Sequence, residues 1–238
     1  MAEYYETVLY RIASHGFFVF GIDYEFPVEE NLTGNRNNKL TQDISKYFKQ
    51  YEWLKGFMMG KTVALPLWNT TGLACHSAGC DSTLKMIKQK PENFTSTVFL
   101  EPYSDDVKEK VNLGKPAFMY GTEYSEGVPL KCAIPGHDYN TFYAIWSCPK
   151  VVMNVANFGH CDMLDTVPWT VCKISHFCKV TANETMLPVY REFVQGAVSS
   201  FFISTLQRRS DAINFIVEKP LIPLALKELK SDWNCTKT

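Results

Sequence analysis

The sequence lacks several features that would place it in a broad functional class. Its longest apolar runs, such as residues 17–22 and 197–203, fall far short of the roughly 20 residues that span a bilayer. Neither sign of charge is in excess, because 24 Lys and Arg oppose 25 Asp and Glu. A net charge of −1 gives no reason to expect nucleic acid or an anionic membrane as a partner. We also find no internal repeat and no low-complexity block.

What is present indicates one globular domain over residues 1–238. A chain of this length can bury a full core, and 46% hydrophobic residues with 14% aromatics exclude disorder. Helix-like and strand-like segments alternate, which is typical of an α/β fold. We expect helices at residues 4–14, 43–57, 81–90 and 187–206, and strands at residues 17–22, 94–100, 115–121 and 151–155.

A candidate nucleophile lies in the stretch Cys75-His76-Ser77-Ala78-Gly79-Cys80. A β-rich approach precedes it and a helix-compatible run follows, and this is the context that a nucleophile elbow requires. The turn is tight, so its neighbouring residues should be small, and Gly79 meets that demand. The backbone N–H of Ala78 would then face an oxyanion. Cys75 and Cys80 stand where glycines are usual, and a serine in an ordinary strand–helix turn is the alternative.

The partners of such a serine should follow in chain order, first an acid and then a histidine. Glu101 stands where the strand at residues 94–100 ends, and His160 stands in the loop after the strand at residues 151–155. Loops beyond the carboxyl ends of strands hold the chemistry of α/β proteins. Asp105 and Asp106 are nearby competitors for the acid, and a loop histidine without a catalytic role is the alternative for His160.

Five segments carry a family resemblance. His76-Ser77-Ala78-Gly79 matches the core of a G-H-S-R-G-G elbow, and Phe99-Leu100-Glu101-Pro102 is similar to a strand that ends in Asp-Pro. Residues 159–165 are close to G-H-M-D-M-L-D, residues 12–24 are similar to a strand with its approach, and residues 191–194 are similar to a closing helix. Over about residues 5–230 the chain resembles the chlorophyllase family of α/β-hydrolases, and more loosely secreted lipases and acetylhydrolases.

The resemblance implies an α/β-hydrolase fold, with a mostly parallel sheet and helices on both faces. It implies a serine hydrolase that cleaves hydrophobic carboxylic esters through an acyl-enzyme, with Ser77 as nucleophile, His160 as base and Glu101 as acid. The substrate would be the phytyl ester of chlorophyll or a lipid ester, and no cofactor or metal is expected. The alternative is a non-catalytic protein that binds a tetrapyrrole or a lipid on a degenerate hydrolase fold.

The sequence has no counterpart of the histidine-glycine loop that supplies a second oxyanion donor. Ser14-His15-Gly16 is not that loop, because it lies before the expected strand at residues 17–22 rather than after an earlier strand. Losing one oxyanion donor typically lowers turnover by about 100- to 1,000-fold, so we expect the chain as printed to be a poor enzyme. We expect the fold to lack its N-terminal strands, including a central one.

Five N-x-[ST] sequons indicate passage through a glycosylating compartment, where chance predicts about two. They are at Asn31, Asn69, Asn93, Asn183 and Asn234. Eight cysteines agree with a secreted or lumenal location, although residues 1–6 do not form a signal peptide. We therefore expect a front-truncated product of a longer secreted protein.

The cysteines offer several arrangements. Cys132, Cys148, Cys172 and Cys178 fall near cysteines of the resembled family, which favours the pairs Cys132–Cys148 and Cys172–Cys178 among 105 pairings. Zinc is the rival for the stretch from Cys172 to Cys178 with His176 between them, but its spacing fits no common ligand pattern. Cys75 and Cys80 could form a disulfide or remain free as small fillers.

Overall fold

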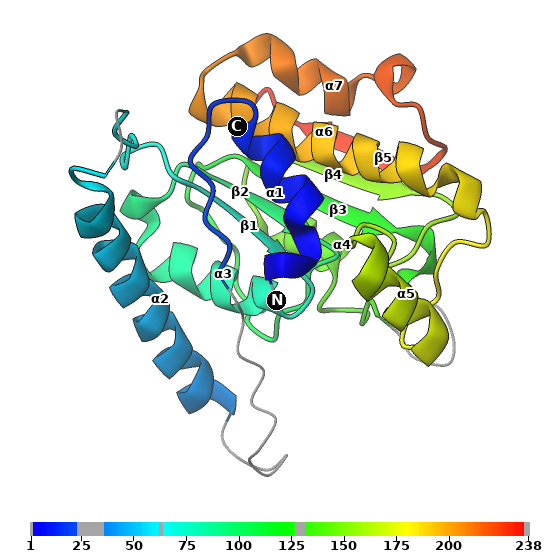
Figure 1. The fold of residues 1–238 in the computed structure, drawn as a ribbon, viewed down its shortest axis with the longest axis horizontal. Coiled ribbons are helices and arrows are strands. Elements are labelled where there is room, and N and C mark those ends of the chain that lie inside the picture. The colour runs from blue at the N-terminus through cyan, green and yellow to red at the C-terminus, as the bar shows by residue number, and fades with distance from the viewer. Residues whose placement is uncertain (1, 23–35, 62–63, 127–131, 236–238) are drawn as a thin grey trace.

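The computed structural model describes residues 2–22, 36–61, 64–126 and 132–235 (Figure 1). Its α-helices are α1 (Glu6–Ala13), α2 (Arg36–Met58), α3 (Gly79–Gln89), α4 (Tyr139–Ile145), α5 (Thr166–Ser175), α6 (Leu187–Leu206) and α7 (Asn214–Val217). The strands are β1 (Gly72–His76), β2 (Ser96–Leu100), β3 (Ala117–Thr122), β4 (Lys150–Val155) and β5 (Leu226–Asp232). Short 3-10 helices include η1 (Ala2–Tyr5) and η3 (Glu123–Glu126).

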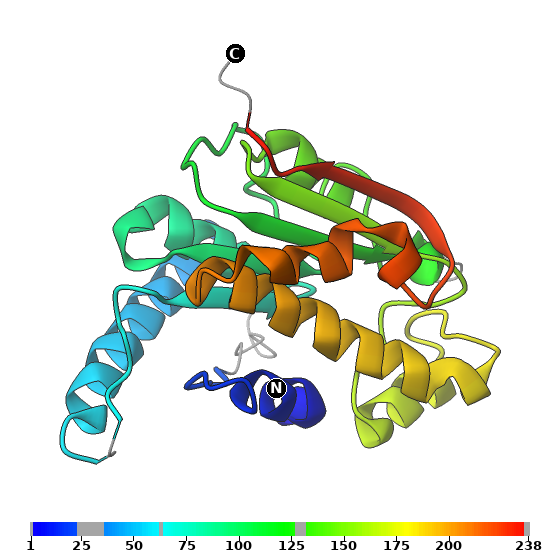
Figure 2. The same cartoon turned by 90° about the horizontal axis from the view of Figure 1, so that it is seen from above.

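In the described ranges the strands form one five-stranded sheet in the order β1-β2-β3-β4-β5. Neighbours from β1 to β4 are parallel, and β5 pairs antiparallel with β4. Helices α1, α6 and α7 cover one face, and α2, α3 and α4 cover the other (Figures 1 and 2). This arrangement confirms the α/β architecture, with its mostly parallel sheet and helices on both faces.

The central strands β2, β3 and β4 are buried along almost their whole length and are mostly apolar, because both faces of the sheet are covered. Successive side chains of a strand point to opposite faces. In β2, Val98 joins the cluster under α1 and α6, and Phe99 joins the cluster under α3 and α4. Phe118 and Met119 of β3 divide in the same way. The sheet is therefore a rigid base whose carboxyl edge positions the loops that follow each strand.

The strand expected at residues 17–22 is wrong, because this segment has no regular secondary structure. A strand needs a neighbour to accept and donate its backbone hydrogen bonds, and the segment has no strand beside it in the described ranges. Its aromatic side chains pack on the body instead: Phe17 contacts Phe202 and Phe20 stacks on Trp68. Strand β1 is consequently an edge strand of the described sheet.

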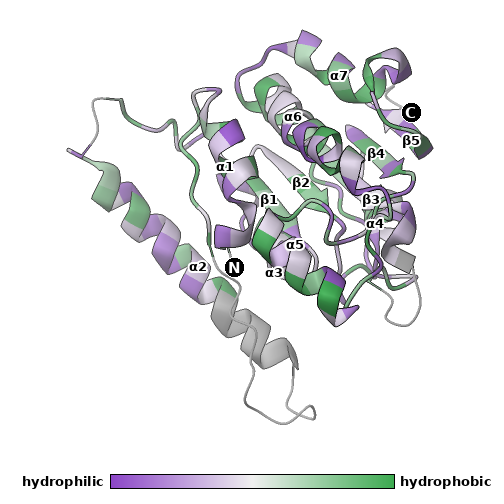
Figure 3. Cartoon of the chain, turned by 45° about the vertical axis from the view of Figure 1, so that its right-hand side comes forward, coloured by the Kyte–Doolittle hydropathy of each residue, from purple (hydrophilic) through white to green (hydrophobic). Residues whose placement is uncertain are grey.

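Helices α2 and α5 carry hydrophobic residues, green in Figure 3, and several of these are exposed. On α5, Val167, Val171 and Ile174 are 76%, 62% and 73% exposed. On α2, Trp53 stacks on Phe57, and both are exposed. Among the helices that the structure describes, none has the length and apolar character needed to cross a membrane.

Candidate active site

Ser77 lies at the turn between β1 and α3, as the elbow pattern predicts. Its backbone has a φ of 55°, in the left-handed region that non-glycine residues rarely adopt. Three hydrogen bonds hold this conformation: the Ser77 N–H donates to the carbonyl of Leu100, and the Ser77 carbonyl accepts from the N–H groups of Cys80 and Tyr103. The serine therefore has the strained strand–turn–helix setting of a nucleophile elbow.

The small residue expected at Gly79 is not required sterically in this structure. A β-carbon built on Gly79 would have no heavy atom within 4 Å, and its φ is not positive. The turn opens outward here because Gly79 is already the first residue of α3. The elbow is instead closed by a disulfide between Cys75 and Cys80, so these residues are not free thiols.

Glu101 lies immediately after β2, with a φ of 46° and only 2% of its surface exposed. Its N–H donates to the carbonyl of Tyr120 on the neighbouring strand. One carboxylate oxygen, Oε2, accepts a hydrogen bond from the Ser125 hydroxyl. Burial raises the pKa of Glu101, while hydrogen bonds from His160 and Thr122 oppose that rise. The charged form of Glu101 is thus favoured only by these hydrogen bonds, against the effect of burial.

His160 lies in the loop after β4, and 5% of its surface is exposed. Its Nδ1 is 3.4 Å from Oε2 of Glu101, so the structure brings together the predicted base and the predicted acid. The rival acids face elsewhere: Asp105 lies 3.4 Å from Nδ1 of His137, and Asp106 pairs with Lys88. Position at the ends of β2 and β4 explains why Glu101 and His160 meet.

The loop that holds His160 is organised by Asp162, a residue that the sequence did not single out. This carboxylate is fully buried and accepts hydrogen bonds from the N–H groups of Gly159 (2.7 Å) and Thr181 (2.9 Å) and from the Trp169 indole (2.7 Å). Burial raises its pKa, and these three donors lower it. Asp162 therefore ties the backbone just before His160 to Thr181 and to the Trp169 side chain.

Within the described residues, no hydrogen bond joins the Ser77 hydroxyl to His160. The link between the two is indirect: the ring of His76, the residue before Ser77, lies 4.3 Å from the ring of His160. Catalytic hydrogen bonds are often long in enzymes without bound substrate. The contact between the predicted acid Glu101 and the predicted base His160 is therefore formed, and His160 lies next to the elbow without a hydrogen bond to Ser77.

Tyr5, from η1, also reaches this site and was missed by sequence reasoning. Its hydroxyl lies 2.5 Å from Nδ1 of His76, and the two rings meet edge to face. Burial raises the pKa of Tyr5, so its hydroxyl keeps its proton and stays neutral beside His76. Burial and the nearby His160 keep the pKa of His76 well below its usual value, so His76 is neutral. Nothing in the local sequence around Tyr5 indicates this long-range contact.

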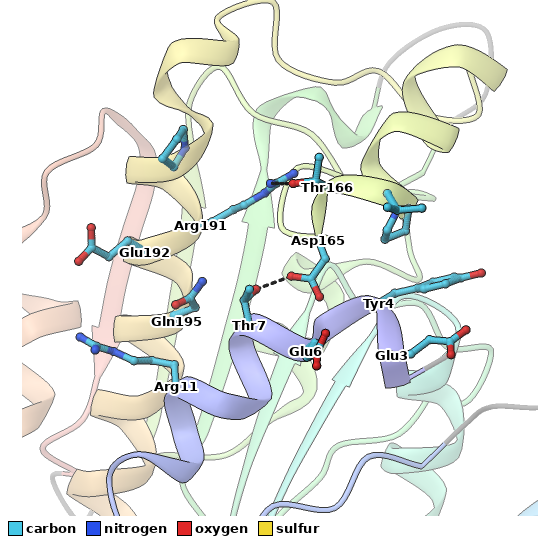
Figure 4. A pocket seen from close by; sticks show the side chains of 13 residues that line it. Glu3, Tyr4, Glu6, Thr7, Arg11, Asp165, Thr166, Arg191, Glu192 and Gln195 are labelled. Carbon is cyan, nitrogen blue, oxygen red and sulfur yellow. Dashed lines mark hydrogen bonds between the residues drawn. The ribbon is translucent and has the colours of Figure 1, made fainter.

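A pocket of about 790 Å³ lies beside the site, between α1, the start of α5 and α6 (Figure 4). The Thr7 hydroxyl donates to Asp165 across it, and Arg191 donates to the hydroxyl of Thr166. Ser77, Glu101 and His160 do not line it, and charged side chains of both signs do. Its lining does not suit a hydrophobic ester.

The disulfides differ from the expected pairs Cys132–Cys148 and Cys172–Cys178. The pairs are Cys75–Cys80, Cys132–Cys178, Cys148–Cys235 and Cys161–Cys172.

The geometry of the sheet explains why Cys132 does not pair with Cys148. Cys132 follows the carboxyl end of β3, and Cys148 precedes the amino end of the parallel β4, about 20 Å away along six-residue strands. The second pair is wrong because Cys172 faces Cys161 and Cys178 faces Cys132, although the sulfurs of Cys161, Cys172 and Cys178 lie within 4.8 Å of one another. Cys172 and Cys178 are both bound in disulfides, so neither offers the thiolate that a zinc ion would need. His176, the third candidate ligand, is exposed at the end of α5.

No curated protein matches the chain. Among solved structures, a ferulic acid esterase from Streptomyces cinnamoneus is similar, with a TM-score of 0.53 and 16% sequence identity. The match covers 86% of this chain and 62% of that esterase, so this chain spans less than two thirds of its length. At this identity the likeness shows the fold alone, and it agrees with an α/β-hydrolase.

A family model described as chlorophyllase matches residues 107–232, which is more than half of the chain. The matched segment includes His160 and its loop, and it begins after Ser77 and Glu101. The protein belongs to the chlorophyllase family.

Proposed function

We propose that the protein is a serine hydrolase that cleaves carboxylic esters of hydrophobic substrates. The observation that carries the proposal is the buried contact between His160 and Glu101, 3.4 Å apart, beside the strained elbow of Ser77. Family membership and the fold support an ester hydrolase as the coarse assignment. The phytyl ester of chlorophyll and lipid esters are the substrate classes that we propose.

In the proposed mechanism, the Ser77 hydroxyl attacks the ester carbonyl while Nε2 of His160 accepts its proton. Glu101 faces Nδ1 of His160 and stabilises the imidazolium that forms. The Ala78 N–H donates to the oxyanion, and the protonated His160 then gives its proton to the leaving alcohol. Water attacks the acyl-enzyme by the same route in reverse, and this releases the acid and restores Ser77.

His160 must approach Ser77 for the first proton transfer, since the two are not hydrogen-bonded in the described residues. The neutral His76 ring lies against the His160 ring and leaves no competing charge beside the imidazolium. Asp162 limits the movement to the His160 side chain, because it fixes the backbone at Gly159.

A fluorophosphonate probe tests the proposal directly. The folded protein should be labelled at Ser77, as located by mass spectrometry, and Ser77→Ala should abolish labelling. Ser82→Ala is the matched control, because Ser82 is a buried serine of α3 whose hydroxyl has no partner in the described residues. Unlabelled protein from the same preparation would then be assayed for release of alcohol from chlorophyll and from lipid esters, and prior labelling should abolish that release.

Failure of a folded protein to react at Ser77 would contradict the esterase proposal. Titration with chlorophyll or a fatty acid, followed by absorbance or fluorescence, would then test the non-catalytic alternative of tetrapyrrole or lipid binding. Labelling at another serine would assign the nucleophile elsewhere and would equally reject Ser77.

A further inference from the structure

The Cys75–Cys80 disulfide spans the proposed nucleophile. Cys75 belongs to β1 and Cys80 to the first turn of α3, so the crosslink joins the end of the strand to the start of the helix. Their Cα atoms are 5.0 Å apart, and Ser77 and Ala78 lie inside the closed loop. Cys80 is fully buried, and the sulfur of Cys75 contacts the carbonyl of Val98 on β2.

The conformation that this crosslink encloses needs support. Ser77 has a φ of 55°, and such left-handed residues persist only where their surroundings hold them. The hydrogen bonds at the elbow come from β2 and its loop through Leu100 and Tyr103, and from Cys80 itself. They hold the elbow from one side of β1 and from the helix.

The other side of β1 has no strand partner in the described part of the sheet. An edge strand has fewer neighbours to oppose twisting or fraying of its end. The end of β1 is the point where Ser77 must be held, because only two residues, Ser77 and Ala78, separate β1 from α3. A covalent link between Cys75 and Cys80 supplies at this point the constraint that a second neighbouring strand would give.

We propose that the Cys75–Cys80 disulfide is a positioning element for catalysis, which holds the Ser77 hydroxyl and the Ala78 N–H in the geometry needed for attack on the ester. The proposal rests on the assignment of Ser77 as nucleophile. The cysteines touch neither substrate nor the reacting atoms, so they act through the turn that they close. Displacement of a reacting group by about 1 Å typically lowers the rate by about 100-fold.

The chain supplies a matched control in Cys148–Cys235. That disulfide ties the segment before β4 to the end of β5 over a sequence separation of 87, whereas Cys75 and Cys80 are five residues apart. Loop-closure entropy grows with the length of the closed loop, so Cys148–Cys235 should contribute more to global stability. Removing each crosslink therefore separates positioning from stability.

The experiment compares wild-type protein with C75S/C80S and C148S/C235S, which leave no unpaired thiol. We measure the rate constant for labelling of Ser77 by a fluorophosphonate, kcat and KM for the best ester, and the melting temperature. For C75S/C80S we expect the labelling rate and kcat to fall by at least about tenfold with KM unchanged, because binding groups stay in place. We expect C148S/C235S to melt at a lower temperature than C75S/C80S and to keep the wild-type labelling rate.

An unchanged labelling rate and kcat in folded C75S/C80S would overturn the proposal. So would a rate loss in C148S/C235S equal to that in C75S/C80S, since the effect would then be one of stability. If the variant does not fold, wild-type protein is partly reduced with a phosphine, alkylated and mapped by mass spectrometry. Loss of labelling should then track alkylation of Cys75 and Cys80, and labelling that persists on chains alkylated there would overturn the proposal.

The two proposals fail in different ways. Wild-type protein that is not labelled at Ser77 would reject the esterase assignment before any variant is made. Wild-type protein that is labelled, together with C75S/C80S that is labelled equally fast, would reject only the role of the disulfide.

Discussion

Burial places two opposing demands on the Glu101 carboxyl group. Only 2% of Glu101 is exposed, and burial favours the uncharged form, which raises its pKa. The proposed role requires the charged form, because only a carboxylate stabilises the imidazolium of His160. A folded state with a raised carboxyl pKa is most favoured when the group is protonated. The associated stability is complete below the unfolded pKa of about 4.3 and is lost as pH rises through the folded pKa.

Glu101→Gln should therefore improve stability while it removes activity. At neutral pH the variant avoids the buried charge, so its free energy of unfolding should exceed that of wild type, and the difference should vanish near pH 4. Its kcat should fall by about 1,000- to 10,000-fold, because Gln does not hold the imidazolium in the same way. Urea unfolding at several pH values and ester hydrolysis provide the measurements.

Glu123→Gln is a control, because the pKa of Glu123 is shifted in the opposite direction to that of Glu101. A hydrogen bond from Lys227, followed by one from the Asn157 N–H, lowers the pKa of Glu123, so its stability is present above the unfolded pKa and is lost as pH falls through the folded pKa. This variant should lose a little stability at neutral pH and keep its activity. If the free energy of unfolding varied with pH in the same way for Glu101→Gln and wild type, burial would not be raising the pKa of Glu101.

Site residues could be predicted where they directly follow a strand of the parallel sheet. Glu101 and His160 follow buried strands, and parallel strands bring such positions together at one edge. Tyr5, Asp162 and the Ser125 hydroxyl were not predicted, because each acts through a contact that has no periodic pattern. The disulfide pairing was wrong for the same reason, since sequence distance does not give spatial distance across the sheet.

At the scale of elements, the loop between β4 and α5 is packed tightly around His160. A β-carbon on Gly159 would lie 1.9 Å from the carbonyl oxygen of Lys179, which is backbone and has little freedom to move. Asp162 and the Cys161–Cys172 disulfide hold the same loop against α5 and Thr181. The position of His160 is therefore set by the backbone path of two segments.

Gly159→Ala should disturb both stability and activity. Overpacking of this kind typically lowers the free energy of unfolding by roughly 1–3 kcal/mol, and the shifted loop should slow labelling of Ser77. Gly79→Ala is the matched control, because its new β-carbon would meet no atom within 4 Å, and it should change stability by less than about 1 kcal/mol. Melting temperature and labelling rate are the readouts. A larger loss for Gly79→Ala than for Gly159→Ala would contradict the packing argument.

Most elements with a buried face were predicted, and those without one were not. The segment 187–206 has the bounds of α6, and residues 94–100 contain β2. Strand β5, with its sequence LKELKSD, was missed because it is charged and half exposed, and it forms by pairing with β4 while only Leu226 and Leu229 pack on the core. The segment 17–22 shows the reverse error: it has a strand-like composition and no strand to pair with. β propensity describes fit to a sheet and does not create one.

For the molecule as a whole, the four disulfides indicate an oxidising compartment. They pair all eight cysteines of the sequence. The positions of the sequons are compatible with glycosylation, because Asn69, Asn183 and Asn234 are exposed and Asn93 is half-buried. Asn31 lies outside the described residues. We therefore propose that the protein matures in the secretory pathway.

Glycan attachment tests this proposal. When the chain is expressed behind a heterologous signal peptide in eukaryotic cells, Asn69 and Asn183 should carry glycans that peptide-N-glycosidase removes, as read by mass spectrometry. Asn112 and Asn140 are controls, because both are exposed and neither lies in a sequon. A secreted chain with bare Asn69 and Asn183 would contradict glycosylation at these sites.

The order of the strands also has a consequence for how the chain acquires its shape during synthesis. Each strand of the described sheet pairs with its neighbour in sequence, so β1 to β5 can be added one after another as the chain leaves the ribosome. Helix α1 differs, because Val8 and Ile12 share their core cluster with α6, whose residues are made much later. Helix α1 is therefore made well before the helix on which it packs, and it can complete its core contacts only after α6 has been synthesised.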